Sequence, residues 1–78
     1  MQYQVNLKFI KEERLKRELT LQQMADKLGV KSKSDYFKRE TGDTNFKPAE
    51  LPVLAELFGV DLEKIFVKSF RKSKQEVS

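Results

Sequence analysis

Apolar residues recur at helical spacing between residues 20 and 29. The stripe occupies positions i, i+3, i+4 and i+7 and consists of Leu21, Met24, Ala25 and Leu28. Thr20 and Gln23 have the spacing of a capping box, in which a hydroxyl and an amide satisfy free backbone N–H groups at a helix start. Gly29 suits the left-handed conformation that ends many helices. The pattern predicts a short helix followed by a sharp corner.

A second short helix is expected directly after that corner. Ser32 or Ser34 can cap its start, and Gly42 is the next residue suited to a left-handed stop. Helical periodicity places Tyr36 and Glu40 on the face toward the preceding helix. The opposite face carries hydroxyl, ammonium and aromatic groups, on Ser34, Phe37, Lys38 and Thr41. Such groups can hydrogen-bond base edges or phosphates and contact thymine methyl groups, so this face is a candidate surface for reading DNA.

Three more helices are expected outside this pair. The first runs from Leu7 to about Glu18, and Asn6 can cap it. Its inward face carries Leu7, Ile10, Arg14 and Leu15, and its other face carries Phe9. The next helix begins near Pro48 and ends at Gly59, with a core stripe of Leu51, Leu54, Ala55 and Phe58. A last short helix is capped by Asp61, and it closes the core with Leu62, Ile65 and Phe66.

Arg14 lies in the middle of an apolar stripe, so it needs a partner. Glu40 is the natural one because it also lies on the inward face of its own helix. A guanidinium can engage a carboxylate through two hydrogen bonds and so fix the angle between two helices. We expect such an ion pair; the alternative is that both side chains reach solvent.

Composition narrows the classes of function. The chain has 78 residues, enough for one domain with a small core. It contains neither cysteine nor histidine, so the sequence offers no disulfide, no thiolate ligand and no histidine base. It also lacks a secretory signal pattern and a bilayer-spanning apolar run. We therefore expect a cytoplasmic protein that is not an enzyme, has no membrane partner, and needs no cofactor, metal or small-molecule ligand.

Charge is unevenly distributed along the chain, whose net charge is +4. Residues 50–66 carry Lys64 against four carboxylates, on Glu50, Glu56, Asp61 and Glu63, a sum of −3. Basic residues concentrate instead in the first helix, in residues 31–47 and at the C-terminal end. A molecule with one basic and one acidic end orients in the field of a phosphate backbone. The alternative is an ordinary charged surface that keeps the domain in solution.

The segment LTLQQMADKLGVKSKSDYFKRETG resembles the helix-turn-helix core of the Cro and phage-repressor family. Upstream, IKEER resembles the first helix of that family, with its arginine. Downstream, FKPAELPVLAELFGVDLEKIF resembles its fourth and fifth helices. The resemblance implies an all-α, five-helix, lambda-repressor-like domain over residues 1–66, followed by a basic tail over residues 67–78. It also implies that Tyr36 packs in the core and that Arg14 and Glu40 form a buried ion pair.

The segment VKSFRKSKQEVS at the C-terminus has three possible arrangements. It can form a disordered basic tail with phosphate affinity, a strand paired with MQYQV, or a dimerisation segment. The first five residues alternate between polar and apolar, which favours an extended segment. Several apolar residues have no buried position in the helical scheme, namely Tyr3, Val5, Phe9, Val67 and Phe70. A short terminal strand pair is therefore an open alternative to the tail.

The resemblance implies a sequence-specific regulator of transcription that binds double-stranded DNA. A homodimer would cover an inverted repeat with half-sites about 34 Å apart and occlude the operator. The residues expected to meet base edges are Lys33, Ser34, Phe37 and Lys38. Those expected to hold phosphates are Gln22, Thr41, Thr44, Asn45 and Lys47. The family implies a phage or prophage regulator, although an antitoxin or a host regulator would look the same.

The chain departs from the family pattern at two points, the first of which bears on a second hypothesis. The family usually has a DNA-contacting glutamine directly after the capping threonine, where this chain has Leu21. The stretch from Gly29 to Glu40 is also one residue longer than the common pattern. Leu21 and an exposed Phe37 favour a protein-interaction module that kept the fold and lost DNA binding. An RNA ligand is a further alternative, although the chain lacks the aromatic platforms typical of single-strand binding.

Overall fold

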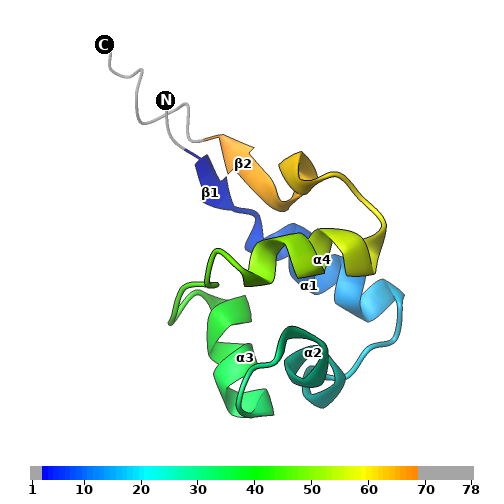
Figure 1. The fold of residues 1–78 in the computed structure, drawn as a ribbon, viewed down its shortest axis with the longest axis vertical. Coiled ribbons are helices and arrows are strands. Elements are labelled where there is room, and N and C mark those ends of the chain that lie inside the picture. Colours follow the sequence, from blue (N-terminus) through cyan, green and yellow to red (C-terminus); the bar gives the residue numbers. More distant parts are fainter. Residues whose placement is uncertain (1–2, 69–78) are drawn as a thin grey trace.

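The computed structural model describes residues 3–68. Its four α-helices are α1 (Leu7–Lys16), α2 (Leu21–Leu28), α3 (Lys33–Thr41) and α4 (Glu50–Phe58). One 3-10 helix, η1 (Leu62–Ile65), and two strands, β1 (Tyr3–Val5) and β2 (Phe66–Lys68), complete the order. The strands pair antiparallel and lie at one end of the molecule, whereas α2 and α3 lie at the other end (Figure 1). The fold is therefore mostly helical, with the expected helix-turn-helix.

The last element corrects the expectation of five α-helices. Residues 62–65 form a 3-10 helix, and Phe66 already has extended backbone angles, with φ −113° and ψ 155°. Asp61 occupies the position before this helix, but its side chain makes no capping hydrogen bond. The Asn6 N–H donates to the Ile65 carbonyl at 2.7 Å, so pairing with the N-terminal segment draws the chain out of helical geometry. A fifth α-helix therefore cannot continue past Ile65.

The strand pair is one of the three arrangements that the sequence left open for the chain end. Gln4 lies opposite Val67, and Val5 lies opposite Phe66. Val5 and Phe66 pack against the core, whereas Gln4 and Val67 are exposed. Strand β2 continues to Lys68, two residues past the boundary expected at residue 66. The rest of the expected basic tail, from residue 69 onward, and Phe70 with it, lie outside the described residues.

Helices α2 and α3 of the helix-turn-helix begin and end at the capping residues that the sequence predicts. Thr20 and Gln23 form the capping box. The Thr20 backbone N–H donates to the Gln23 side chain at 2.8 Å, and the Gln23 backbone N–H donates to the Thr20 hydroxyl at 3.0 Å. Gly29 ends α2 with φ 72°, and Gly42 ends α3 with φ 92°. Ser32, rather than Ser34, caps α3 by accepting a hydrogen bond from the backbone of its first turn. These local signals confirm both helices of the motif.

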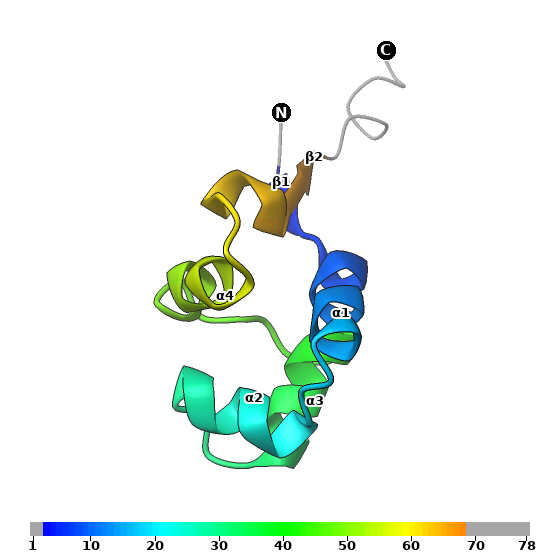
Figure 2. The same ribbon diagram turned by 90° about the vertical axis from the view of Figure 1, so that its right-hand side faces the viewer.

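The core lies between the helices and includes a residue from the loop before α4. Its fully or almost fully buried members are Ile10, Met24, Ala25, Tyr36, Phe46, Leu54, Ala55, Phe58 and Ile65. Figure 2 shows α1 and α4 between the strands and the α2–α3 pair, so all four α-helices contribute to one core. Leu21, Leu28 and Leu51 pack against its edge. The predicted stripes of α2 and α4 are thereby confirmed.

The predicted faces of α1 and η1 need correction. Helix α1 ends at Lys16, and Glu18 turns the chain toward α2 with a positive φ of 56°. Leu15 is 54% exposed, whereas Phe9 packs edge-on against Phe58 with ring centroids 6.2 Å apart. Ile10 and Arg14 are buried as expected, but Phe9 is packed in place of Leu15 because its ring meets Phe58 at the end of α4. Leu62 in η1 is likewise 44% exposed instead of buried.

The position of Pro48 relative to the start of α4 also differs from expectation. Pro48 does not occupy the first helical position, because α4 begins at Glu50 after a turn that includes Pro48 and Ala49. Pro52 is the third residue of α4. Backbone N–H groups of a first helical turn have no acceptor within the helix, so a proline there removes no helical hydrogen bond.

Candidate nucleic-acid interface

Four side chains that the sequence assigned to base edges lie together on the outer face of α3. Lys33, Ser34, Phe37 and Lys38 are exposed, and Phe37 is 48% exposed. With Leu21 and Asp43 they line one surface hollow of about 360 Å³. The hollow therefore joins the start of α2, the outer face of α3 and the loop after α3.

The inner face of α3 is tied to α1 by a hydrogen-bonded network. Arg14 donates from Nε and Nη2 to the two carboxylate oxygens of Glu40, at 2.9 and 3.0 Å. The Tyr36 hydroxyl donates to the same carboxylate at 2.8 Å, and Arg14 Nη1 donates to the Leu19 carbonyl at 3.1 Å. The structure thus joins the two residues that the sequence analysis paired. Burial raises the pKa of the Tyr36 phenol, and its hydrogen bond to Glu40 adds to this shift.

A second ion pair, which the sequence analysis missed, fixes the other end of α3. Arg39 donates from Nε to Glu50 at 2.9 Å, and Glu50 also accepts the Lys47 backbone N–H at 2.9 Å. Both charged side chains are largely buried. The helix dipole favours a carboxylate in the first turn of α4 and a cation in the last turn of α3. These two positions could have been recognised in the sequence.

The loop between α3 and α4 carries most of the expected phosphate contacts, and its backbone is fixed. Thr44 donates its N–H to the Lys38 carbonyl at 3.1 Å, and the Thr41 hydroxyl donates to the same carbonyl at 3.2 Å. Phe46 anchors the loop in the core, edge-on to Tyr36 with ring centroids 6.1 Å apart. Sequence reasoning overlooked Phe46, although it is a large apolar residue in an otherwise polar loop. The side chains of Thr41, Thr44, Asn45 and Lys47 remain exposed.

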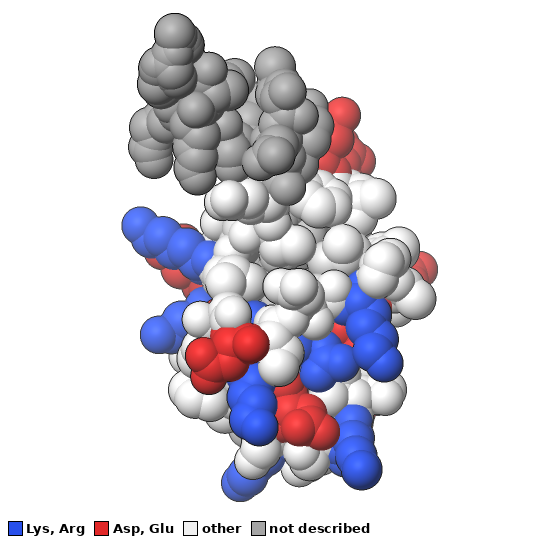
Figure 3. Space-filling view, turned by 90° about the vertical axis from the view of Figure 1, so that its left-hand side faces the viewer, with Lys and Arg blue, Asp and Glu red and all other residues white. Residues whose placement is uncertain are grey.

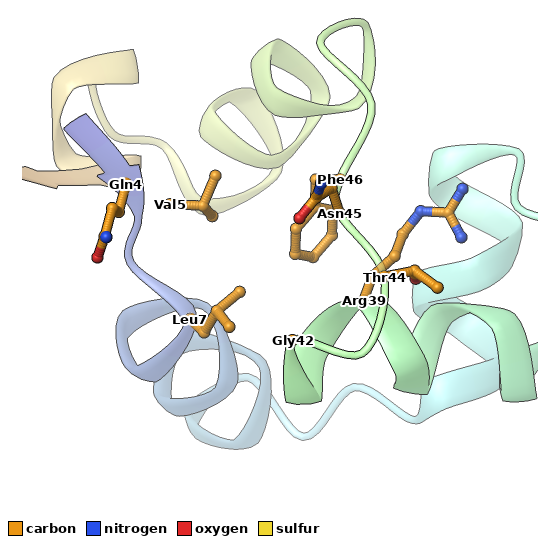
Figure 4. A pocket seen from close by; sticks show the side chains of 8 residues that line it. All are labelled: Gln4, Val5, Leu7, Arg39, Gly42, Thr44, Asn45 and Phe46. Atoms are coloured by element: carbon orange, nitrogen blue, oxygen red, sulfur yellow. The ribbon is translucent and has the colours of Figure 1, made fainter. Parts of the chain in front are cut away.

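Thr44 and Asn45 also border a second cleft, of about 540 Å³, between this loop and the N-terminal segment. In the close-up, Val5, Leu7 and Phe46 lie around the opening, whereas Thr44 and the Arg39 guanidinium extend away from it (Figure 4). The cleft thus combines the apolar side chains of Val5, Leu7 and Phe46 with polar lining residues that include Gln4 and Arg39.

Gln22 is placed apart from the other expected phosphate ligands. It is exposed on α2, and its amide nitrogen donates to Asp26 at 3.0 Å, one turn along the same helix. Leu21, its neighbour, is the residue of α2 that reaches the hollow on α3. The hollow thus contains an apolar side chain directly after the capping threonine.

Many cations of the molecule already have a carboxylate partner. Arg17 and Lys16 both contact Glu13, and hydrogen bonds from Arg17 and then Lys16 hold the pKa of Glu13 below its usual value. The Arg17 guanidinium also lies over the Phe58 ring, 5.2 Å from its centroid, and donates to the Phe58 carbonyl. Arg14, Arg17 and Arg39 each reach another helix in this way. The charges of these three residues and of Lys16 are opposed by a carboxylate of the protein itself.

The lysines around the helix-turn-helix have no such partner. Within residues 3–68, no ion pair joins a carboxylate to Lys31, Lys33, Lys38 or Lys47. Figure 3 views the side of the molecule on which α3 and the following loop lie. Lys and Arg side chains are spread over the end of this face away from the strands, with carboxylates between them. Positive charge is thus present near the hollow without forming an uninterrupted patch.

Two other kinds of feature are absent from residues 3–68. No group of three or more acidic side chains lies close enough to hold a metal ion there. Over the same residues, no helix is long and apolar enough to cross a membrane.

Comparison with known families assigns the fold. The model of a helix-turn-helix family matches residues 10–65, which span α2, α3, α4 and η1 and most of α1. No curated protein and no solved structure matched the chain. The matched range is well over half of the 78 residues. The chain therefore belongs to the helix-turn-helix family of Cro and the phage repressors, a family of regulators that bind double-stranded DNA and not a family of enzymes.

Proposed function

We propose that this protein is a sequence-specific transcriptional regulator that inserts α3 into the major groove of its operator. One observation carries the proposal: α3 is fixed on its inner side and free on its outer side. Arg14 and Glu50 hold it from within through Glu40 and Arg39. Within the described residues, four side chains on its outer face have no hydrogen bond or ion pair: Lys33, Ser34, Phe37 and Lys38.

A fixed helix with unpartnered polar groups suits recognition of bases. Because the backbone of α3 is already held in place, it loses little conformational entropy when it binds. Lysine can donate to guanine O6 and N7, serine to several base edges, and a phenyl ring contacts a thymine methyl group. We assign base contacts to the four outer residues of α3 and phosphate contacts to Gln22, Thr41, Thr44, Asn45 and Lys47. Phosphate contacts set the register of a protein on the duplex without reading its sequence.

The proposed mechanism is occlusion of the operator by a homodimer in the cytoplasm. Two copies of α3 would enter successive major grooves about 34 Å apart on an inverted repeat. A dimer bound in this way blocks polymerase without any catalytic step. The basic residues after position 68, Arg71, Lys72 and Lys74, would add affinity for phosphates that is independent of sequence. A phage or prophage origin completes the proposal.

Selection of bound sequences from a random duplex pool tests this function. We expect a palindromic consensus, because a symmetric dimer reads the same half-site twice. Replacing Lys38 by Ala should weaken binding to that consensus by about 1–3 kcal/mol and leave the thermal midpoint nearly unchanged. Lys64→Ala is the matched control, since Lys64 is an exposed lysine in η1, at the end of the molecule that carries the strands. Failure to retain any duplex at low salt would contradict the proposal.

A second candidate function is a protein-interaction module or antitoxin with the same fold and little DNA binding. The observation in its favour is apolar surface on α3, where Phe37 is 48% exposed beside Leu21. The two functions differ in their dependence on salt. Phosphate contacts make DNA affinity fall steeply as salt rises, whereas an apolar contact with a protein partner is largely insensitive to salt. An absence of salt-dependent DNA retention would favour the second candidate.

A further inference from the structure

The hollow on α3 combines two apolar side chains with polar neighbours. Leu21 is the first residue of α2 and packs partly against the core, so its position is fixed. Phe37 comes from the middle of α3 and is about half exposed. Both line the same hollow, together with Lys33, Ser34, Lys38 and Asp43. An apolar pair drawn from both helices of the motif therefore lies within the proposed DNA-reading surface.

The Asp43 carboxylate bears on which part of a duplex the hollow would meet. Asp43 contributes a carboxylate to it, and a carboxylate repels a phosphate group. A base edge carries no net charge, and cytosine presents an amino group that a carboxylate can accept from. Lys33 and Lys38 line the same hollow and offset this repulsion, so the carboxylate and the apolar pair, and not the net charge, favour base edges there.

The apolar pair further limits which base group fits between these side chains. Placing an unpaired carbonyl or amino group of a base against leucine and phenylalanine would cost free energy, because its hydrogen bonds to water are lost. The C5-methyl group of thymine is the one apolar group that the major groove presents. Building on the proposed function, we infer that Leu21 and Phe37 together read a C5-methyl group on a pyrimidine of the operator. Leu21 would then be a specificity residue that acts by contact with a methyl group instead of by hydrogen bonding.

The expected size of the effect follows from the surface that one methyl group removes from water. Burial of one such group is worth about 0.8 kcal/mol, which corresponds to roughly fourfold in affinity. Replacing thymine by uracil removes only this methyl group and leaves every hydrogen-bonding group of the base pair in place.

The test uses the full chain and the operator chosen by selection, with thymines replaced by uracil one position at a time. Affinity is measured by fluorescence anisotropy at one fixed salt concentration. For the unmodified protein we expect about fourfold weaker binding at one thymine or more in each half-site, and less than twofold change elsewhere. Phe37→Ala and Leu21→Gln should bind thymine and uracil operators equally at those positions. Leu62→Gln is the control, because it removes an exposed leucine from the opposite end of the molecule.

Each outcome separates this inference from the proposed function. Selection without any consensus would contradict the proposed function itself. A consensus that the unmodified protein binds equally with thymine or uracil at every position would overturn only the role of Leu21 and Phe37. Discrimination that persists in both variants would also overturn it. If Leu21→Gln fails to fold by circular dichroism, the uracil series with the unmodified protein and Phe37→Ala still decides the question.

Discussion

Removing the Arg14 guanidinium should strongly destabilise the domain, because it leaves a carboxylate buried without its counter-ion. Arg14→Met keeps an unbranched side chain of similar length and deletes two hydrogen bonds to Glu40 and one to the Leu19 carbonyl. The Glu40 side chain is only 2% exposed, so water cannot replace the lost donors. Its remaining partner in the described residues would be the Tyr36 hydroxyl.

The expected loss is large relative to the stability of the whole domain. Breaking one partner of a buried pair costs about 3–5 kcal/mol. Domains are stable by roughly 0.05–0.15 kcal/mol per residue, which gives about 4–12 kcal/mol for a chain of this size. At about 4–8 °C per kcal/mol for small domains, the thermal midpoint should fall by roughly 12–40 °C.

Removing both charges should cost less than removing one. In Arg14→Met combined with Glu40→Leu, no charge remains buried, and replacement of a buried pair by apolar residues is often neutral or stabilising. The Tyr36 hydroxyl then has no acceptor, which costs about 1–3 kcal/mol. Adding Tyr36→Phe removes this unsatisfied group. The triple variant should therefore be more stable than Arg14→Met alone.

Urea unfolding followed by circular dichroism measures these differences. The slope of the unfolding free energy with urea should stay constant, because the surface exposed on unfolding is nearly unchanged. Lys11→Met is the control for an exposed cation on the same helix. The reasoning would be refuted by an unfolding free energy of Arg14→Met within about 1 kcal/mol of the unmodified protein. A triple variant less stable than the single one would refute it as well.

Three further predictions concern other parts of the structure. The pKa of Glu13 is lower in the folded chain, so this residue stabilises the fold above its unfolded pKa, near 4.5, and the contribution is lost as pH falls through the folded value. Glu13→Gln should make the thermal midpoint less dependent on pH below about 4.5. A variant whose midpoint is lower at every pH but depends on pH as steeply as that of the unmodified protein would contradict this. Gly42→Ala should destabilise the domain by more than the roughly 1–2 kcal/mol expected for Gly59→Ala. Both glycines have positive φ, but a Cβ at Gly42 would lie 3.2 Å from a leucine methyl group of α1; equal urea midpoints would show that this contact relaxes. Asp43→Asn should strengthen binding to random duplex by up to about 1 kcal/mol at low salt, because a negative charge is removed from the surface that faces the polyanion; unchanged retention in mobility shifts would place Asp43 away from DNA.

Signals between residues close in sequence were sufficient to predict much of the helix-turn-helix. The capping box of Thr20 and the left-handed stops at Gly29 and Gly42 depend only on backbone geometry over a few residues. Arg14 and Glu40 could be paired for a related reason. A charge within an apolar stripe requires a buried partner, and helical periodicity left one suitable candidate on the facing helix.

Contacts between distant segments decided the rest. Residues 62–65 leave α-helical geometry because Phe66–Lys68 pairs with Tyr3–Val5, 60 or more residues earlier in the chain. Phe9 is packed because its ring meets Phe58, about fifty residues later in the chain, whereas Leu15 is exposed. Phe46 joins the core through its contact with Tyr36.

The candidate site likewise has a part that the sequence predicts and a part that depends on contacts between distant segments. The sequence by itself determined the outer face of α3, because the periodicity of one helix orders Ser34, Phe37 and Lys38 relative to Tyr36 and Glu40. Only the tertiary structure brought Leu21 and Asp43 to that face and engaged Arg39 with Glu50. Helical periodicity fixes directions within one element, whereas the distance between two elements depends on how their side chains fill the space between them.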